Sequence, residues 1–158
     1  MTGIAYEDLE PGRVIDLGRV HIDREQMVEF ARSYDPQPFH LDEHAARNSI
    51  FGGLCASGWF TGSLWMRAYA DAVLIGSTGQ GSPGLTELSW LAPVWPDDEL
   101  DLRVEVLSRR RSASRPGLGL ASMRGTAHRG EQCVLRMAYV GLFATRASAG
   151  QGADDPGR

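Results

Sequence analysis

The chain has 158 residues, of which 42% are hydrophobic and 23% are charged, and its formal net charge is -4. This length fits one domain with a substantial core, and the mildly acidic balance gives no reason to expect nucleic acid or an anionic membrane as partner. All sixteen basic side chains are arginines, so a Schiff-base mechanism through lysine is excluded.

The N-terminal residues have neither the basic nor the apolar region of a secretory signal, and no apolar run is long enough to cross a bilayer, so we expect a cytoplasmic protein. Cys55 and Cys133 lack the spacing of metal ligands or redox motifs. We expect each to be a reduced, packed thiol, and we expect no metal site. A single domain over residues 1–147 should be followed by a disordered tail, because residues 148–158 are small and polar.

The first half of the chain predicts one strand and several helices. Residues 13–22 follow a Pro-Gly turn and have the apolar pattern of a strand. Asp23 is expected to cap a helix, and Asp42 is expected to cap a shorter helix that ends at Arg47. Residues 57–74 form the strongest helix candidate, and their apolar residues cover more than one face, so this helix should be largely buried.

A glycine-rich stretch, residues 76–84, should end the regular structure before a series of strands. The strand-like runs are residues 85–91, 99–110, 118–128 and 132–143. This order of elements predicts an α+β domain in which an antiparallel sheet wraps one long helix. Such a sheet has a broad outer face and an open edge, which suggests self-association.

Two residues suited to proton transfer, Asp35 and His40, lie in a proline-rich stretch. Pro36 and Pro38 restrict their own backbone and that of the preceding residues, so we expect a stiff, irregular loop rather than a helix face. A carboxylate and an imidazole held in this way can act as general acid and base. The alternative is a turn in which Asp35 caps a helix and His40 lies on the surface.

The segment from Asp35 to Asp42, DPQPFHLD, is followed by FGGLCASG from Phe51 to Gly58. The two segments and their separation resemble the motifs of the MaoC-like dehydratases, also called the hydratase 2 family. The resemblance extends more loosely from about residue 6 to 143. It implies a hot-dog fold, a homodimer or higher oligomer, and reversible hydration of the α,β double bond of an enoyl thioester. Coenzyme A or an acyl-carrier would then be part of the substrate, with no separate cofactor.

The resemblance also implies roles for individual residues. Asp35 and His40 would transfer the protons, and which of them takes the proton from water stays open. The amide of Gly58, at the start of the buried helix, would bind the thioester oxygen. Alternatively, Ser57 is only a helix cap and Gly58 only a packing glycine. The residues expected to contact the substrate are Gln37, Pro38, Phe39, Phe51, Ser57 and Trp59.

The chain departs from the family pattern at three positions. Gln37 replaces the usual Asn, Ser57 replaces the His found in many members, and Met66 stands where some hydratases have a serine. These changes predict a pocket that differs from that of the short-chain hydratases. Arg109 to Arg111, with Arg115, either contact the phosphates of a coenzyme A substrate or form a solvated strand end.

Two other functions fit the same fold. A hot-dog thioesterase would hydrolyse the thioester, but such enzymes usually place an acid or base on the central helix, where Asp71 is poorly placed. A non-catalytic subunit that binds acyl thioesters or supports an assembly is the third possibility, although it would not need both Asp35 and His40.

Overall fold

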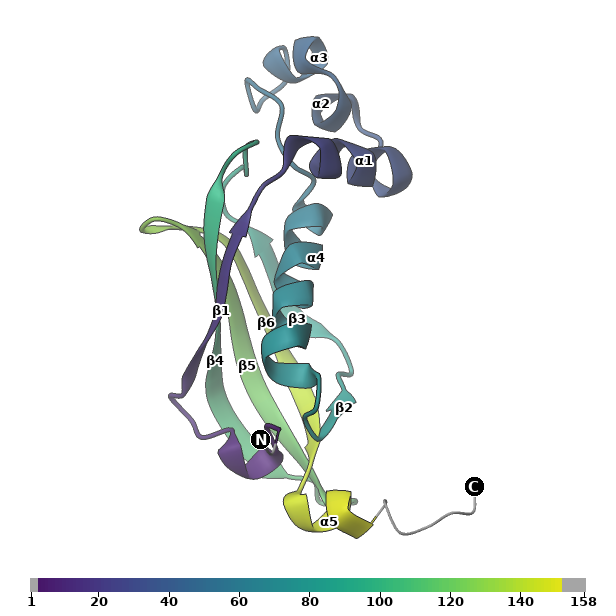
Figure 1. Cartoon of the computed structure of the whole chain (residues 1–158), viewed down its shortest axis with the longest axis vertical. Helices are drawn as coiled ribbons and strands as arrows, with labels where there is room; N and C mark the ends of the chain where they lie inside the picture. Colours follow the sequence, from purple (N-terminus) through teal and green to yellow (C-terminus); the bar gives the residue numbers. More distant parts are fainter. Residues whose placement is uncertain (1–2, 152–158) are drawn as a thin grey trace.

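In the computed structural model, which describes residues 3–151, a curved antiparallel sheet wraps one long helix (Figure 1). The elements in chain order are η1 (Tyr6–Asp8), β1 (Val14–His21), α1 (Arg24–Tyr34), α2 (Pro38–Leu41), α3 (Glu43–Arg47), α4 (Gly58–Tyr69), η2 (Ala70–Leu74), β2 (Gly79–Gly81), β3 (Leu85–Trp90), β4 (Glu99–Arg111), β5 (Leu118–Arg129), β6 (Gln132–Ala144) and α5 (Arg146–Gln151). The predicted α+β architecture is therefore confirmed.

The strands pair in the order β1-β4-β5-β6-β2, and β3 also pairs with β6. Every pairing is antiparallel. The four strands predicted after residue 84 are all present, with ends that differ by one residue at most. Strand β2 lies inside the glycine-rich stretch and was not predicted. It consists of Gly-Gln-Gly, and a segment with two glycines cannot show the alternation of apolar and polar side chains that identifies a strand.

The inner face of the sheet forms the core with α4. On β4 the side chains of Leu100, Leu102, Val104 and Val106 are completely buried, as the strand alternation requires. Trp65 of α4 packs on this face, and its ring occupies the space in which a Cβ on Gly125 would lie. The Trp65 Nε1–H donates to the carbonyl of Arg103 at 3.2 Å, which fixes the position of the helix on the sheet.

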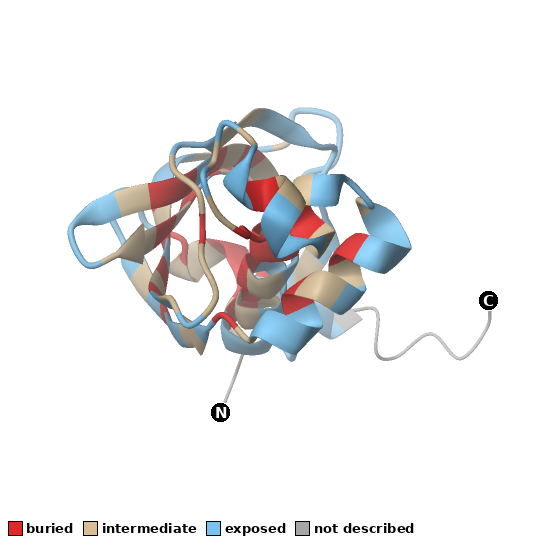
Figure 2. Cartoon of the chain, turned by 90° about the horizontal axis from the view of Figure 1, so that it is seen from above, coloured by how far each residue is buried: buried red, intermediate tan, exposed pale blue. Residues whose placement is uncertain are grey.

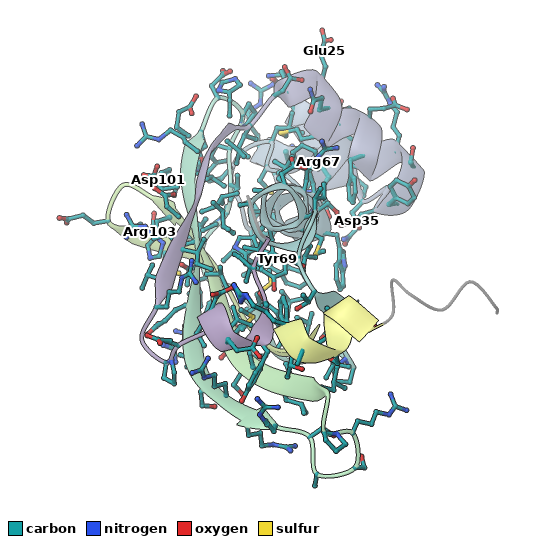
Figure 3. The ribbon with its side chains drawn as sticks, turned by 60° about the horizontal axis from the view of Figure 1, so that its bottom comes forward. Glu25, Asp35, Arg67, Tyr69, Asp101 and Arg103 are labelled. Carbon is teal, nitrogen blue, oxygen red and sulfur yellow. The ribbon has the colours of Figure 1, made fainter. Side chains whose placement is uncertain are left out.

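The outer face of the sheet is charged instead. Cross-strand ion pairs join Arg19 to Asp101 at 2.8 Å and Arg136 to Glu87 at 2.7 Å. Asp101 and Arg103 lie on the side of the sheet away from α4 (Figure 3). The edge strand β3 differs from this face, because its Leu85 and Trp90 are apolar and about half exposed.

Helix α4 is less enclosed than its sequence predicted. Its buried residues are Phe60, Thr61, Trp65 and Tyr69, whereas Trp59 and Met66 are half exposed. The helix continues into η2, a π-helical turn that ends at Leu74. The sheet covers one side of α4 only, so the second apolar face of the helix lines a groove and not the core.

Helices α1, α2 and α3 lie above one end of the sheet (Figure 1). Asp23 and Asp42 cap α1 and α3 as predicted, accepting from the amides of Gln26 and Ala45. Seen from above, the buried residues of these helices face the interior around α4 and their outer surfaces are exposed (Figure 2). The contacts of this segment with the start of α4 include the Ser57–Asp35 hydrogen bond and the packing of Phe30 of α1 on Phe60, with ring centroids 5.5 Å apart.

At the other end of the sheet, residues 148–151 belong to α5, although we expected the disordered tail to begin at Ser148. The Ser148 hydroxyl donates to the carbonyl of Gly117 at 2.7 Å, which attaches this turn to the sheet. The remaining residues of the expected tail, 152–158, lie outside the described part of the chain. Among residues 3–151, no helix combines the length and apolar character that a membrane span requires.

Candidate active site

Asp35 follows the last residue of α1 and leaves the helical conformation. Its amide still donates to the carbonyl of Ala31, but its φ of -149° and ψ of 65° end the helix. Pro36 explains the break, because a proline disfavours the helical conformation of the residue before it. The carboxylate consequently turns away from α1 and lies beside α4 (Figure 3).

His40 lies on the one-turn helix α2, and not on an irregular loop as we expected. Pro38 occupies the first turn of α2, where a missing amide hydrogen costs nothing and a fixed φ favours the helix. The imidazole is 7% exposed, and its Nδ1 is 2.8 Å from the carbonyl of Cys55. A carbonyl only accepts, so Nδ1 carries the hydrogen, and Nε2 faces Asp35 Oδ2 at 3.4 Å.

Two side chains hold the Asp35 carboxylate. The Ser57 hydroxyl donates to Oδ2 at 2.7 Å, and the Gln37 amide donates to Oδ1 at 2.7 Å. Burial raises the pKa of Asp35, but the hydrogen bonds from Ser57 and Gln37, together with the nearby His40, outweigh that effect. The pKa of this carboxyl therefore lies below its ordinary value, and the group is ionised at neutral pH.

The start of α4 lies against the same site. Ser57 caps the helix by accepting from the amide of Trp59 at 3.2 Å, while its own hydrogen goes to Asp35. Among residues 3–151, no carbonyl or side chain accepts from the amide of Gly58, as is usual in the first turn of a helix. The indole of Trp90 lies where a Cβ on Gly58 would be, 2.4 Å from that position. Gly58 is thus required for packing, and its amide is also free for a ligand.

Asp35 and His40 line one cavity of about 420 Å³, together with Gly58. Four of the residues expected to contact the substrate line the same cavity, namely Gln37, Phe39, Phe51 and Trp59. Pro38 and Ser57 do not line it. Pro38 begins α2 at the surface, and Ser57 is completely buried, so its contribution to the site is made through Asp35 and not through the substrate.

Sequence patterns did not predict several residues of the site. The carbonyl of Cys55 orients His40, and burial raises the pKa of the Cys55 thiol to about 11, so this thiol is a packed, neutral group. Trp90 and Val94 reach the cavity from β3 and from the segment after it. The only signal for Trp90 was its place at the end of a predicted strand, which does not identify its neighbour on α4.

The arginines considered as phosphate ligands lie at the opposite end of β4. Arg109 donates to the carbonyls of Tyr6 and Glu7, at 3.0 and 2.7 Å. Arg111 lies over the ring of Tyr6, 5.7 Å from its centroid. Because β4 begins beside β1 near α1 and ends beside η1, these side chains hold the N-terminal turn and are remote from Asp35 of the same chain (Figure 1).

The family model described as "MaoC like domain" matches residues 8–120, which is well over half of the chain. The chain belongs to the MaoC-like domain family. A crystal structure of the MaoC-like dehydratase from Rhodospirillum rubrum is 37% identical, with a TM-score of 0.82, and the match covers 91% of this chain and 99% of that one.

Two further structures share the fold of this MaoC-like protein. The R-hydratase PhaJ1 from Pseudomonas aeruginosa is 24% identical with a TM-score of 0.68, and the match covers 90% of this chain and 86% of that one. A Mycobacterium tuberculosis protein with a double hotdog fold is 20% identical with a TM-score of 0.72, over 91% of this chain and 45% of that one. The hot-dog fold implied by the resemblance is thereby confirmed.

The MaoC-like domain thus brings together groups that are suited to proton transfer. An ionised carboxylate and an imidazole share one cavity, and a free amide at the positive end of α4 adjoins them. The same cavity has aromatic walls, since Phe39 and Phe51 lie 4.6 and 6.4 Å from the imidazole, ring centre to ring centre.

Proposed function

We propose that this protein is a hydro-lyase that adds water to the α,β double bond of an enoyl thioester, or removes it from the 3-hydroxyacyl thioester. The observation that carries this proposal is the separation of 3.4 Å between His40 Nε2 and Asp35 Oδ2 inside a ligand-sized cavity. The family name and the structure from Rhodospirillum rubrum, a MaoC-like dehydratase, favour the same reaction class.

In the proposed reaction, Asp35 Oδ2 and His40 Nε2 share one proton between them. One side chain can then accept a proton while the other donates one. The hydrogen bonds to Asp35 favour the carboxylate, and in the proposed reaction the shared proton starts on Nε2 of His40. In hydration, Asp35 takes a proton from water as the oxygen bonds to the β carbon, and His40 Nε2–H delivers a proton to the α carbon. The proton on Asp35 then returns to His40 across the gap between Oδ2 and Nε2, and the pair is restored. Each transfer contributes on the order of 10²–10⁴ in rate.

Negative charge develops on the thioester oxygen during this addition. The amide of Gly58 lines the cavity and has no acceptor among residues 3–151, and the positive end of the α4 dipole lies behind it. A donor already oriented toward developing charge stabilises the transition state more than the ground state. We assign this role to Gly58.

The thioesterase alternative lacks a suitable group on the central helix. Asp71 lies in η2, beyond the end of α4, and accepts from Arg67 Nε at 2.8 Å. Both residues face the β1 side of the helix, where they adjoin Leu17 and Val20. The acidic residue on which hydrolysis would depend is therefore paired and away from the cavity of Asp35.

We also propose that coenzyme A is the carrier and that the protein forms a homodimer through the open edge of β3. Half-exposed Leu85 and Trp90 supply apolar surface on that strand. Sedimentation of the purified protein would measure the dimer.

The decisive experiment follows an enoyl-CoA substrate with two readouts. The protein is incubated with crotonyl-CoA and with longer enoyl-CoAs, and the loss of conjugated absorbance is recorded together with the release of free thiol. Loss of absorbance without thiol is the expected result. Thiol release would identify a thioesterase, and no change with any chain length would leave a binding subunit.

A further inference from the structure

The cavity of Asp35 and His40 contains a hydroxyl that the proposed proton transfers do not use. It belongs to Thr61 of α4, which lines this cavity. No other described residue of the lining carries a hydroxyl. Thr61 is only 2% exposed, so its side chain lies in the interior of the site and not at its rim.

The Thr61 hydroxyl has no hydrogen-bond partner within residues 3–151. A threonine or serine inside a helix can donate to the carbonyl four residues earlier. Ser63 does so, because its hydroxyl donates to the carbonyl of Trp59 at 2.8 Å. The corresponding carbonyl for Thr61 is that of Ser57, which accepts from the backbone amides of Phe60 and Thr61 at 3.0 and 3.3 Å. The hydroxyl of Thr61 is therefore free for a ligand.

The oxygen of this hydroxyl keeps contact with open space. In the described part of the chain, two side-chain nitrogen or oxygen atoms are both fully buried and without a partner, namely Nδ1 of His128 and the hydroxyl of Tyr139. Thr61 Oγ1 also has no partner but is not one of these two, so it retains accessible surface. Because the rest of the residue is buried, that surface faces the cavity that Thr61 lines.

Thr61 lies one turn along α4 from the residue that holds Asp35. Residues three or four apart share a face of a helix, with Cβ atoms about 5–6 Å apart. Thr61 is thus on the same face as Ser57, whose hydroxyl donates to Asp35 Oδ2 at 2.7 Å. It is also on the same face as Gly58, three residues before it. A molecule that contacts both the carboxylate and the amide of Gly58 would therefore lie next to Thr61.

We propose that Thr61 binds the water molecule that adds to the double bond, and the β-hydroxyl of the product. The inference rests on the proposed function, in which Asp35 takes one proton of that water and the amide of Gly58 binds the thioester oxygen. The second hydrogen of the water then needs an acceptor, and a hydroxyl can accept as well as donate. With both hydrogens bonded, to Asp35 and to Thr61 Oγ1, the water keeps a lone pair for the β carbon.

The other walls of the cavity offer little to this second hydrogen. Gln37 has a carbonyl oxygen, but the residue is exposed and its amide group is bonded to Asp35. The apolar side chains of the lining have no acceptor, and they include Phe39, Phe51, Val94 and Val134. A water hydrogen without an acceptor in such surroundings is unfavourable. Thr61 thus orients the water and keeps its own proton throughout.

Thr61→Val removes the hydroxyl and keeps the branched shape of the side chain. It should lower kcat/KM about five- to tenfold for hydration of crotonyl-CoA, which corresponds to the loss of one neutral hydrogen bond. The loss for dehydration of 3-hydroxybutyryl-CoA should be equal, because the equilibrium constant does not change. In hydration the loss should appear in kcat, since the enoyl thioester does not contact Thr61. In dehydration it should appear in KM, since the β-hydroxyl does.

Two further variants separate this role from a structural one. Thr61→Ser retains the hydroxyl and should restore the kinetic parameters, whereas Ser63→Ala removes a hydroxyl bonded to its own helix and should not change them. The midpoint of denaturant unfolding should not fall in Thr61→Val, because no hydrogen bond within residues 3–151 is lost. Thr61→Ala replaces it if the midpoint falls. Unchanged kinetics without the hydroxyl, or a loss that Thr61→Ser does not restore, would overturn the assignment.

Binding without turnover separates this proposal from that of the hydro-lyase. 3-Hydroxybutyryl-CoA and butyryl-CoA differ only in the β-hydroxyl, and calorimetry on His40→Gln measures the ratio of their affinities. Adding Thr61→Val should lower this ratio about five- to tenfold. A lowered ratio in a protein that does not hydrate crotonyl-CoA would retain the Thr61 contact and reject the hydro-lyase. An unchanged ratio in a protein that does hydrate it would reject the contact alone, and no binding of either thioester would reject both.

Discussion

The hydroxyl of Ser57 joins the helix cap of α4 to the carboxylate of Asp35. It accepts from the Trp59 amide at 3.2 Å and donates to Asp35 Oδ2 at 2.7 Å. The residue that caps the central helix therefore also favours the ionised form of Asp35, the proposed base, and it does so from a completely buried position.

Ser57→Ala should move the acidic limb of the pH profile of kcat/KM to higher pH. The substitution removes a hydrogen bond that lowers the pKa of Asp35 and retains the burial that raises it. The carboxylate is consequently lost at a higher pH. The pH at which the stabilising contribution of Asp35 is lost should also rise, because the contribution of a group with a lowered pKa disappears as the pH falls through that pKa. Ser63→Ala, in the same helix, is the control, and an unshifted limb in Ser57→Ala would argue against this role.

Asp35→Asn and His40→Gln should each reduce the hydration rate at least about 100-fold, because each removes one proton-transfer group. Both replacements keep a similar shape, so circular dichroism should show a folded protein. His44→Gln changes an exposed histidine on α3 and should retain activity. Full activity of either variant at position 35 or 40 would refute the proposed mechanism.

Gly58→Ala and Gly62→Ala should have opposite effects on stability. A Cβ at position 58 would lie 2.4 Å from the indole of Trp90, and such overpacking costs about 1–3 kcal/mol. A Cβ at position 62 meets no atom within 4 Å, so Gly62→Ala should stabilise the helix by about 0.5–1 kcal/mol. Denaturant unfolding measures both. Equal effects would mean that Trp90 does not occupy the described position.

Arg109→Ala should lower stability without changing the KM for a coenzyme A thioester. It removes two hydrogen bonds to the carbonyls of η1, which is worth about 1–3 kcal/mol. Arg110→Ala removes an exposed charge from the other face of β4 and serves as the matched control. A KM that rises only in Arg109→Ala would indicate that this arginine contacts the phosphates.

Strands β4, β5 and β6 were predictable because each has one buried face. On β4 the alternation of buried and less buried residues from Glu99 to Val106 is visible in the sequence itself. Strand β2 was missed because Gly79 and Gly81 have almost no side chains, and only backbone pairing with β6 defines it. Helix α2 was missed for another reason, since a proline at Pro38 is compatible with both a loop and the first turn of a helix.

The site was predictable from the sequence in part. The motif that contains Asp35 and His40 singled out two side chains that lie 3.4 Å apart in the structure, and the chain order placed Gly58 at the start of a helix. The contact of Trp90 with Gly58 depends on how β3 is aligned with β6 and on the position of α4 above them, and no local pattern encodes it. The hydrogen bond from Ser57 to Asp35 likewise depends on where the end of α1 lies relative to the start of α4.

The proposed catalytic pair belongs to the segment above the sheet, which contacts the start of α4 through the hydrogen bond between Ser57 and Asp35. Opening of this segment would separate Asp35 from Ser57 while β4, β5 and β6 stay hydrogen-bonded, because its helices lie outside the sheet and parts of a protein can open below the free energy of global unfolding. Heating should therefore inactivate the protein before the sheet melts. Amide exchange would show this as early loss of protection in residues 24–47 alone.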